Sequence, residues 1–244
     1  MTHTIIVGAN SQVILEFIKH RADKKYILLD LPDKLDSIKD CVHKTGIDAE
    51  VLGLDVRNVP DIQALFHKFR VEKVVFSELI YAVGINHLID ATDMTEQIWD
   101  DVVGTNLKGC FFIMKEVALN MIENDVKSGS IVNISSQHAF VGNTQRAAYC
   151  ASKAGLVNLN RVLALEWAMF GIRVNSIAPT WILNAQNEAL LMSQDFKRKN
   201  LRNIPVGRYC ETKDVVGAIN YLLSEDSEMI TGQCIILDGG WTAK

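Results

Sequence analysis

Tyr149 and Lys153 stand four residues apart in the segment AAYCASKAG. Four residues make about one turn of a helix, so both side chains lie on one face if this segment is helical. An ammonium group beside a phenol favours the phenolate and lowers the phenol pKa. A tyrosine in that setting can exchange a proton with a carbonyl or alcohol oxygen near neutral pH. A surface tyrosine followed by a solvated lysine has the same spacing, so the pair alone leaves both interpretations open.

Two more polar residues could join this pair. Ser136 ends the run SIVNISS, thirteen residues before Tyr149, and its hydroxyl could hydrogen-bond a substrate oxygen while Tyr149 transfers a proton. A serine at a strand end can instead bond to local backbone, which is the interpretation given to Ser135. Asn106 in GTNLKG stands at the predicted start of a helix, where it could either cap that helix or take part in catalysis.

The elements that must position these residues alternate between apolar runs and amphipathic segments. An unbroken apolar run predicts a buried strand, and apolar residues at helical spacing predict a helix. The predicted strands cover residues 4–7, 24–30, 50–56, 78–84, 129–135, 171–179 and 232–240, and the predicted helices cover residues 12–20, 59–69, 96–106, 107–124, 147–170 and 214–224. This order is typical of α/β proteins. We expect a doubly wound parallel sheet in a single domain, residues 1–244, with ligands bound beyond the carboxyl ends of the strands.

Residues 180–208 break the alternation. The stretch is polar and rich in Asn, Gln and Arg. Because so long an irregular segment inside a compact domain is usually functional, we expect a substrate-loop insertion that acts as a lid.

Composition argues against several classes of protein. The 244 residues have a formal net charge of −4, so the chain lacks the basic footprint of proteins that bind nucleic acid or anionic membranes. No run reaches the roughly 18 apolar residues of a membrane span, and the start lacks the pattern of a signal peptide. Five scattered cysteines without a C-x-x-C pair predict reduced thiols, with neither disulfides nor a zinc site. We expect a cytoplasmic protein without a metal.

Taken in order, these motifs resemble those of the classical short-chain dehydrogenase/reductase family, whose fold is of the Rossmann type. The matching segments run along the whole chain: LDV with Asp55, GTNLKG with Asn106, SIVNISS with Ser136, YCASK with Tyr149 and Lys153, IRVNSIAP with Pro179, and ILDGG with Asp238. One such match arises easily by chance, whereas the ordered series does not. The resemblance implies hydride transfer between a nicotinamide cofactor and a carbonyl/alcohol pair.

The resemblance also implies roles for individual residues. Tyr149 would be the general acid/base, and Lys153 would lower its pKa and hold the nicotinamide ribose. Ser136 would orient the substrate oxygen, and Asn106 would anchor a water relay to Lys153. The cofactor would be bound by Gly8, Asn10, Gln12, Asp30, Asp55, Val56, Ala82, Gly84, Tyr149, Lys153, Pro179 and Ile182.

The cofactor loop departs from the family pattern T-G-x-x-x-G-x-G. Gly8 matches the first glycine, but Gln12 and Ile14 occupy the other two positions and Val7 replaces the threonine. A Cβ at the second position would push the cofactor phosphates away from the helix N-terminus. We therefore expect weaker cofactor binding, in which the Gln12 amide could donate a hydrogen bond. The family's NNAG has also become YAVG at residues 81–84.

The end of the predicted strand 24–30 bears on the choice of cofactor. Asp30 can bind ribose hydroxyls there and would repel a 2′-phosphate, which favours NAD over NADP. A strand-end carboxylate in water is the alternative interpretation of Asp30.

Residues near the catalytic pair should face the substrate. They are Gln137, His138, Asn143, Gln145 and Arg146, together with Trp181, Asn184, Gln186 and Asn187 at the start of the expected lid. This polar set suits a small hydroxylated or anionic substrate such as a sugar acid or a polyol. GIN at residues 84–86 and the ending DGGWTAK resemble the gluconate 5-dehydrogenase-like branch of the family.

The predicted helices 107–124 and 147–170 are apolar around more than one face. This excess predicts a second buried surface and therefore a homo-oligomer, a tetramer or a dimer; burial within one large core is the alternative. Two other functions remain open. One is a 3-oxoacyl carrier-protein reductase, against which Asp30 and the negative net charge speak. The other is a non-catalytic protein of the same fold whose cofactor loop has degenerated.

Overall fold

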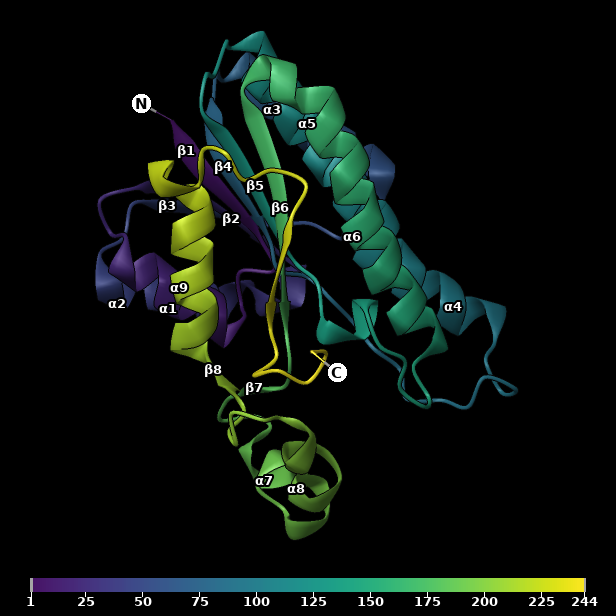
Figure 1. Cartoon of the computed structure of the whole chain (residues 1–244). Coiled ribbons are helices and arrows are strands. Elements are labelled where there is room, and N and C mark those ends of the chain that lie inside the picture. Colours follow the sequence, from purple (N-terminus) through teal and green to yellow (C-terminus); the bar gives the residue numbers. More distant parts are fainter. Residues whose placement is uncertain (1, 244) are drawn as a thin grey trace.

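The computed structural model describes residues 2–243. Seven strands form one parallel sheet in the order β3-β2-β1-β4-β5-β6-β9 (Figure 1). The order reverses between β1 and β4, which confirms the predicted doubly wound topology and places a crevice at their carboxyl ends. The strands are β1 (His3–Val7), β2 (Lys25–Asp30), β3 (Ala49–Gly53), β4 (Phe76–Tyr81), β5 (Gly129–Ile134), β6 (Ile172–Pro179) and β9 (Cys234–Leu237).

Helices cover both faces of the sheet, as the unbroken apolar strands require. In Figure 1, α1, α2 and α9 lie on one face and α3, α4, α5 and α6 on the other. Each layer encloses its own cluster of buried apolar side chains. The helices are α1 (Gln12–His20), α2 (Leu35–Thr45), α3 (Val59–Val71), α4 (Glu96–Val103), α5 (Cys110–Glu123), α6 (Ala147–Trp167) and α9 (Thr212–Leu223). None of the helices within residues 2–243 is long and apolar enough to cross a membrane.

Helix α1 shows how the cofactor loop is built. Ser11 caps the helix by accepting a hydrogen bond from the backbone N–H of Ile14 at 3.2 Å, as expected of an N-cap serine. Ile14 is fully buried, together with Phe17 and Ile18, between α1 and the sheet. The third glycine position of the family pattern is therefore filled by a core side chain.

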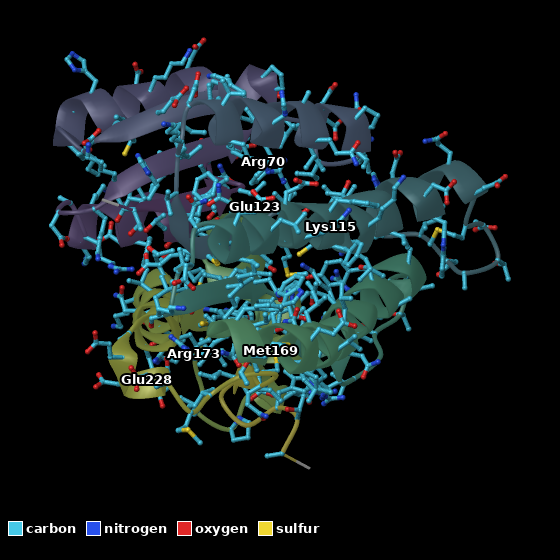
Figure 2. All side chains as sticks on the ribbon, turned by 90° about the horizontal axis from the view of Figure 1, so that it is seen from above. Arg70, Lys115, Glu123, Met169, Arg173 and Glu228 are labelled. Carbon is cyan, nitrogen blue, oxygen red and sulfur yellow. The ribbon has the colours of Figure 1, made fainter. Side chains whose placement is uncertain are left out.

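The opposite layer is joined by ion pairs as well as by apolar contacts. Arg70 on α3 reaches two carboxylates of α5, Glu116 at 2.7 Å and Glu123 at 3.1 Å. Figure 2 shows Arg70 and Glu123 side by side where the two helices meet. These pairs hold α3 against α5 behind the strands that carry the site.

Three expectations about secondary structure were wrong. The predicted helices 96–106 and 107–124 are one continuous helical run, joined by a wide π-helical turn at Gly104–Gly109. Residues 180–208 contain two short helices, α7 (Glu188–Leu191) and α8 (Gln194–Asn200). This stretch also holds the strand β7 (Ile182–Leu183), which pairs with β8 (Cys210–Glu211). Helix α2 was not predicted.

In Figure 1 the α7–α8 segment projects beyond the carboxyl ends of the strands.

Candidate active site

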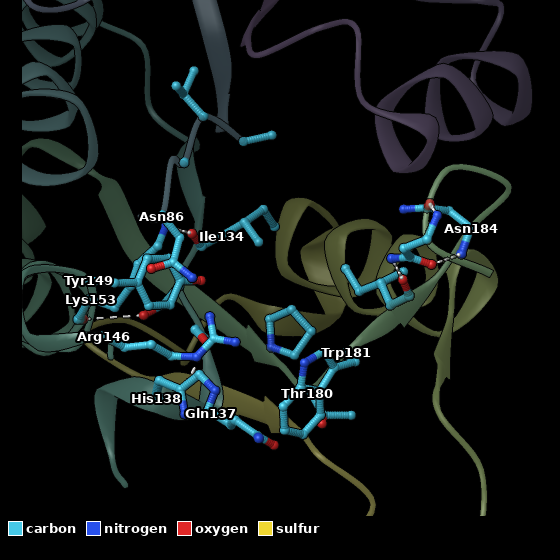
Figure 3. A pocket seen from close by; sticks show the side chains of 18 residues that line it. Asn86, Ile134, Gln137, His138, Arg146, Tyr149, Lys153, Thr180, Trp181 and Asn184 are labelled. Carbon is cyan, nitrogen blue, oxygen red and sulfur yellow. Dashed lines mark hydrogen bonds between the residues drawn. The ribbon is translucent and has the colours of Figure 1, made fainter. Parts of the chain in front are cut away.

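A cavity of about 350 Å³ opens at the carboxyl ends of β4, β5 and β6. It brings together Ser136, Tyr149 and Lys153, which come from the end of β5 and the first two turns of α6 (Figure 3). Six of the nine residues expected to face the substrate line the same cavity: Gln137, His138, Arg146, Trp181, Asn184 and Asn187. Gln186 lines an adjoining cavity instead. Asn143 and Gln145 were expected to face the substrate; both are exposed and lie outside the lining residues.

Lys153 is buried and hydrogen-bonded to a backbone oxygen. Its Nζ donates a hydrogen bond to the carbonyl oxygen of Ile134 at 2.8 Å and lies 5.9 Å from the centre of the Tyr149 ring. Because the amine is buried, its pKa is lowered to about 8, since burial disfavours the charged form. The lysine therefore lies close to its point of deprotonation at physiological pH.

Lys153 is not among the groups that shift the Tyr149 pKa in the cofactor-free protein, so the expected lowering of that pKa by Lys153 stays a prediction. Burial raises the pKa of the Tyr149 phenol above its usual range, and a hydrogen bond from Ser136 and the charge of Arg146 only partly oppose this. Burial outweighs the nearby cations because it removes the phenolate from water. Tyr149 is accordingly a neutral phenol, ready to donate a proton, when the cavity holds no other charge.

Asn106 does not cap a helix, so that interpretation was wrong. It lies inside the wide turn, where its side-chain amide and the peptide group of Ile85 form reciprocal hydrogen bonds of 2.8 and 2.9 Å. A third bond of 3.1 Å joins its Nδ2 to Ser152 Oγ on α6. Asn106 thereby fixes the β4–α4 loop against the helix that carries Tyr149 and Lys153.

Gly84, in the same loop, leaves room for the lysine. A Cβ at Gly84 would lie 3.1 Å from Lys153 Nζ, so a larger residue would press on the amine. Tyr81, where the family has asparagine, is fully buried and donates a hydrogen bond to the Thr105 carbonyl at 2.7 Å. This bond ties the end of β4 to the wide turn.

The two serines after β5 have different environments. Ser135 Oγ donates to the Lys153 carbonyl at 3.2 Å, so it bonds to backbone as expected, although to backbone that is distant in sequence. Ser136 Oγ accepts from the His138 backbone N–H at 3.2 Å, and Ser136 lines the same cavity as Tyr149. The same hydroxyl hydrogen-bonds Tyr149 in the cofactor-free protein, so a ligand oxygen would replace the phenol as its partner.

The cavity wall contains several buried polar atoms that have no hydrogen-bond partner among residues 2–243. They are Asn86 Oδ1, both polar atoms of the Gln137 amide, His138 Nδ1 and Thr180 Oγ1. Gln137 is 1% exposed. Burial and the charge of Arg146 lower the pKa of His138 to about 4, so its imidazole is neutral at pH 7. Unpartnered buried groups are costly, so these atoms offer donors and acceptors to a polar ligand or to water.

An aromatic cluster that the sequence did not reveal closes the outer side of the cavity. The Trp181 ring packs edge to face on His138 at 5.7 Å and on Phe196 at 5.7 Å, and lies 5.0 Å from Trp241. Phe196 belongs to α8, and Trp241 follows the C-terminal DGG. The cluster therefore joins the α7–α8 segment to the wall of the site.

Two further cavities adjoin the first. One of about 370 Å³ is lined by expected cofactor residues: Gly8, Asp30, Asp55, Val56, Ala82 and Gly84. The other, of about 210 Å³, is lined by Asn10, Gln12, Ala82 and Ile182 among others. Pro179 lines the catalytic cavity. Ala82 borders all three, so together they form one groove along the strand ends.

This groove fits an extended dinucleotide. Gly8 has φ +87°, and a Cβ there would lie 2.8 Å from the Ala82 carbonyl carbon, so only glycine allows the tight turn beneath the groove. Asp30 stands at the far end, where its two oxygens accept hydrogen bonds from the N–H groups of Asn10 and Leu31, each at 2.8 Å. Asp55 lies nearby, paired with Arg57 at 2.7 Å, and this pairing lowers the Asp55 pKa.

Within residues 2–243, no group of three or more His, Cys, Asp or Glu side chains is arranged to hold a metal ion. All five cysteines are free thiols. The phenol of Tyr149, the amine of Lys153 and the hydroxyl of Ser136 line the catalytic cavity.

Comparison with known proteins gives the family. The family model described as enoyl-(acyl carrier protein) reductase matches residues 19–242. The chain is 32% identical to the 3-oxoacyl-[acyl-carrier-protein] reductase of Staphylococcus aureus, covering 85% of this chain and 83% of that protein. It is 34% identical to the 2-dehydro-3-deoxy-D-gluconate 5-dehydrogenase of Dickeya dadantii, covering 84% and 82%.

A solved structure of 4-hydroxyisoleucine dehydrogenase complexed with NADH superposes with a TM-score of 0.90 at 31% identity, covering all of both chains. The doubly wound sheet is thus shared with a solved dehydrogenase, and the relatives that the chain matches over most of their length are named as dehydrogenases and reductases. The chain belongs to the short-chain dehydrogenase/reductase family and is an oxidoreductase that interconverts alcohols and carbonyl compounds.

Proposed function

We propose that this enzyme transfers a hydride between NAD(H) and a small hydroxylated acid or the corresponding keto acid. The observation that carries the proposal is the convergence of Ser136, Tyr149, Lys153 and Arg146 on one cavity whose other lining residues are uncharged or apolar. The first three supply proton transfer, and the fourth supplies a cation for an anionic substrate.

The protein residues divide the proton-transfer work. Ser136 Oγ donates a hydrogen bond to the substrate oxygen, which orients and polarises it. Tyr149 donates its phenolic proton to that oxygen in carbonyl reduction and removes the alcohol proton in the reverse direction. Lys153, held on Ile134 O, stabilises the phenolate formed in reduction. Asn106 positions the loop beside Lys153 through its bonds to Ile85. The nicotinamide supplies or accepts the hydride.

Two features of the 370 Å³ cavity support NAD over NADP. Asp30 places a carboxylate at the ribose end, where it would accept hydrogen bonds from ribose hydroxyls and repel a 2′-phosphate. The cation that lines this cavity, Arg57, is already bonded to Asp55 at 2.7 Å and to Asp101 at 2.8 Å. A phosphate would have to compete with both carboxylates for it.

The substrate proposal rests on charge and on unpartnered amides. Arg146 approaches the catalytic cavity from the start of α6 (Figure 3) and would pair with a carboxylate. Gln137, Asn86 and the neutral His138 present both donors and acceptors, which match the hydroxyl groups of a hydroxy acid. The names of two relatives support a small hydroxylated substrate, because one is a 2-dehydro-3-deoxy-D-gluconate 5-dehydrogenase and the other a glycerol dehydrogenase. Another relative is named as an acyl-carrier-protein reductase, so the test must include that substrate class.

A panel of activity assays tests the proposal. Small hydroxy acids, sugar acids, neutral polyols and a 3-oxoacyl thioester are each offered with NAD(H) and with NADP(H). We expect turnover with hydroxy acids and NAD(H). Preference for the thioester with NADPH would replace this function with fatty-acyl reduction. Failure to bind either cofactor at millimolar concentration would instead support a non-catalytic protein.

We also propose that the enzyme is a homo-oligomer. A shallow apolar groove between α4–α5 and α6 is lined by Leu107, Phe111, Leu159 and Val162, among others. Farther along α6, Leu165 is 82% exposed, and exposed apolar surface of this kind is typical of subunit contacts. Light scattering at micromolar concentration tests this, and a monomer would contradict it.

A further inference from the structure

Three buried polar side chains, Asn133, Asn160 and Ser176, form a closed hydrogen-bonded triangle beneath α6. Asn133 of β5 donates to Asn160 of α6 at 2.8 Å, and Ser176 of β6 donates to Asn133 at 3.0 Å. Asn160 in turn donates to the hydroxyl of Ser176. All three residues are at most 1% exposed, and each of their side-chain polar atoms has a partner within the triangle. The polar triangle thus joins the helix to two neighbouring strands at one point.

Asn160 lies on the same stripe of α6 as the catalytic pair. Lys153 follows Tyr149 by four residues, and Asn160 follows Lys153 by seven. At about 100° per residue, all three side chains project within about 40° of one another around the helix axis. The helix runs without a break from Ala147 to Trp167. A rotation or shift at Asn160 is therefore passed on to both catalytic side chains.

The strand side of the triangle leads directly into the same site. The residue after Asn133 is Ile134, whose carbonyl accepts the hydrogen bond from Lys153 Nζ at 2.8 Å. The next is Ser135, whose hydroxyl donates to the Lys153 carbonyl at 3.2 Å. Both of these bonds hold the helix at one residue and leave it free to turn about that point. The polar triangle adds a second fixed point about two turns farther along α6.

The polar triangle differs in chemistry from the packing around it. Leu156 and Leu163, on the same helix, are buried in the apolar layer. Apolar contacts are non-directional, so they tolerate small rotations of the helix. Hydrogen bonds between amides are directional, and a rotation of α6 would leave buried donors and acceptors unpaired. A fully satisfied polar network therefore selects one orientation of the helix.

We propose that the polar triangle fixes the rotation of α6 and makes Asn160 a positioning residue for the catalytic pair. With the triangle closed, Tyr149 and Lys153 are held on the side of Ser136. None of the three triangle residues lines the catalytic cavity, so they act only through the helix. This inference rests on the proposed role of the catalytic pair in proton transfer.

Two alanine variants separate positioning from stability. Asn160→Ala opens the triangle, and Asn120→Ala removes an equally buried asparagine of α5. The Asn120 amide bonds to backbone of Val74 and Phe76 at the start of β4. Both variants should have lower unfolding temperatures, because each leaves buried partners unpaired. Only Asn160→Ala should lower kcat for the best substrate of the activity panel, by about ten- to a hundredfold, because small misplacements of a catalytic group are costly.

A spectroscopic measurement gives a result that needs no substrate. The ¹³Cε signal of Lys153 in ¹³C-lysine-labelled protein, assigned by comparison with Lys153→Met, reports the titration of the amine. The pKa of Lys153 is about 8 in the unsubstituted protein. Asn160→Ala should move this pKa toward 10.5, because a displaced amine is better solvated. Asn120→Ala should leave it unchanged.

ADP binding, measured by calorimetry, shows whether the effect is local. The residues that line the Asp30 cavity include none from α6, so the Kd for ADP should not change in Asn160→Ala. Equal loss of ADP binding would mean that the whole fold is disturbed, which contradicts a positioning role.

A third variant keeps the test decisive if Asn160→Ala is too unstable to assay. In Asn133→Val/Asn160→Leu/Ser176→Ala the whole triangle is apolar, so no member is left unpaired and stability should be retained. The loss of kcat and the change in the Lys153 titration should persist, because the directional bonds are gone.

Unchanged kcat and an unchanged Lys153 titration in the triple variant overturn the proposal. An equal loss of kcat in Asn120→Ala also overturns it, because activity would then follow stability alone. If Tyr149→Phe keeps full activity, the proposed proton transfer itself is wrong. That outcome is distinct from a catalytic pair that ignores residue 160.

Discussion

Lys153 donates a hydrogen bond to the carbonyl oxygen of Ile134 at 2.8 Å, and within residues 2–243 it forms no ion pair with a carboxylate, so burial dominates its pKa. A buried ammonium without a counter-ion destabilises the folded state below its own pKa. We therefore expect Lys153 to be required for activity and, at the same time, to lower the stability of the folded protein.

Lys153→Met should abolish activity but stabilise the cofactor-free protein at pH 7. The pKa of Lys153 is lowered to about 8 in the fold, so between pH 8 and about 10.5 the unfolded chain binds more protons than the native protein. The free-energy cost of burying the charged Lys153 is thus complete below pH 8 and disappears as the pH rises to about 10.5. Denaturant unfolding should show the variant more stable by about 1–3 kcal/mol at pH 7, with the difference shrinking by pH 10. A less stable variant at pH 7 would contradict this.

Tyr149→Phe should remove proton transfer and leave cofactor binding intact. General acid–base catalysis contributes about 10²–10⁴-fold, so kcat should fall by at least about a hundredfold. The Kd for NADH should change by less than about tenfold, because the substitution removes one hydroxyl among many expected cofactor contacts. Tyr221→Phe, an exposed tyrosine on α9, is the control. Retention of more than a tenth of the activity in Tyr149→Phe would show that another group carries the proton.

Arg146→Met should raise KM for carboxylate substrates and spare neutral polyols. A charge-assisted hydrogen bond to a substrate carboxylate is among the stronger polar contacts, and about tenfold in KM is expected. Steady-state kinetics on a matched acid and alcohol measure the difference, with Arg161→Met on the exposed side of α6 as control. Equal effects on both substrates would place the carboxylate elsewhere.

His138 should make the protein sensitive to acid. Its pKa is lowered to about 4 by burial and by Arg146, whereas in the unfolded chain it is about 6.5. Between these values the unfolded chain binds more protons than the native protein. The contribution of neutral His138 to the free energy of unfolding is therefore complete above pH 6.5 and is lost as the pH drops toward 4. Between pH 7 and pH 4, the free energy of unfolding should fall by about 2 kcal/mol more than in His138→Gln. Parallel pH profiles for the two proteins would refute this contribution.

Gly8→Ala should cost more stability than Gly46→Ala, although both glycines have positive φ. A Cβ at Gly8 would lie 2.8 Å from backbone of Ala82, whereas one at Gly46 meets nothing within 4 Å. Conformational strain alone costs about 1 kcal/mol, and the clash adds to it at Gly8. Thermal unfolding of both variants provides the comparison, and equal losses would show that β4 yields to the new side chain.

The sequence predicted the sheet well because each strand is an unbroken apolar run that must be buried on both faces. It missed α2, whose one fully buried side chain, Ile38, lies among charged residues. It missed α7 and α8 because helices of four and seven residues depend on tertiary contacts such as that of Phe196 with Trp181. Local pattern carries no sign of those contacts.

The order of the motifs predicted where the catalytic groups lie, but it did not predict their pKa values. The raised pKa of Tyr149 follows from burial, which depends on how β5, β6 and α6 enclose the phenol. The role of Asn106 was ambiguous for a related reason. A wide turn inside a helix leaves the apolar spacing on either side nearly unchanged, so a cap and an internal residue look alike in sequence.

The wide turn at Gly104–Gly109 has a geometric consequence for the whole helical layer. One residue more per turn rotates everything after it by about 100° around the helix axis. The run before the turn, α4, packs on α6, whereas the run after it, α5, packs on α3 and β4. The continuous helix thereby presents one side to α6 before the turn and a different side to α3 and β4 after it. Asn106 lies in the turn where this rotation occurs. Removing one residue there would rotate the apolar side of α5 out of register with the sheet and, by the same rotation, carry the Asn106 amide away from Ile85.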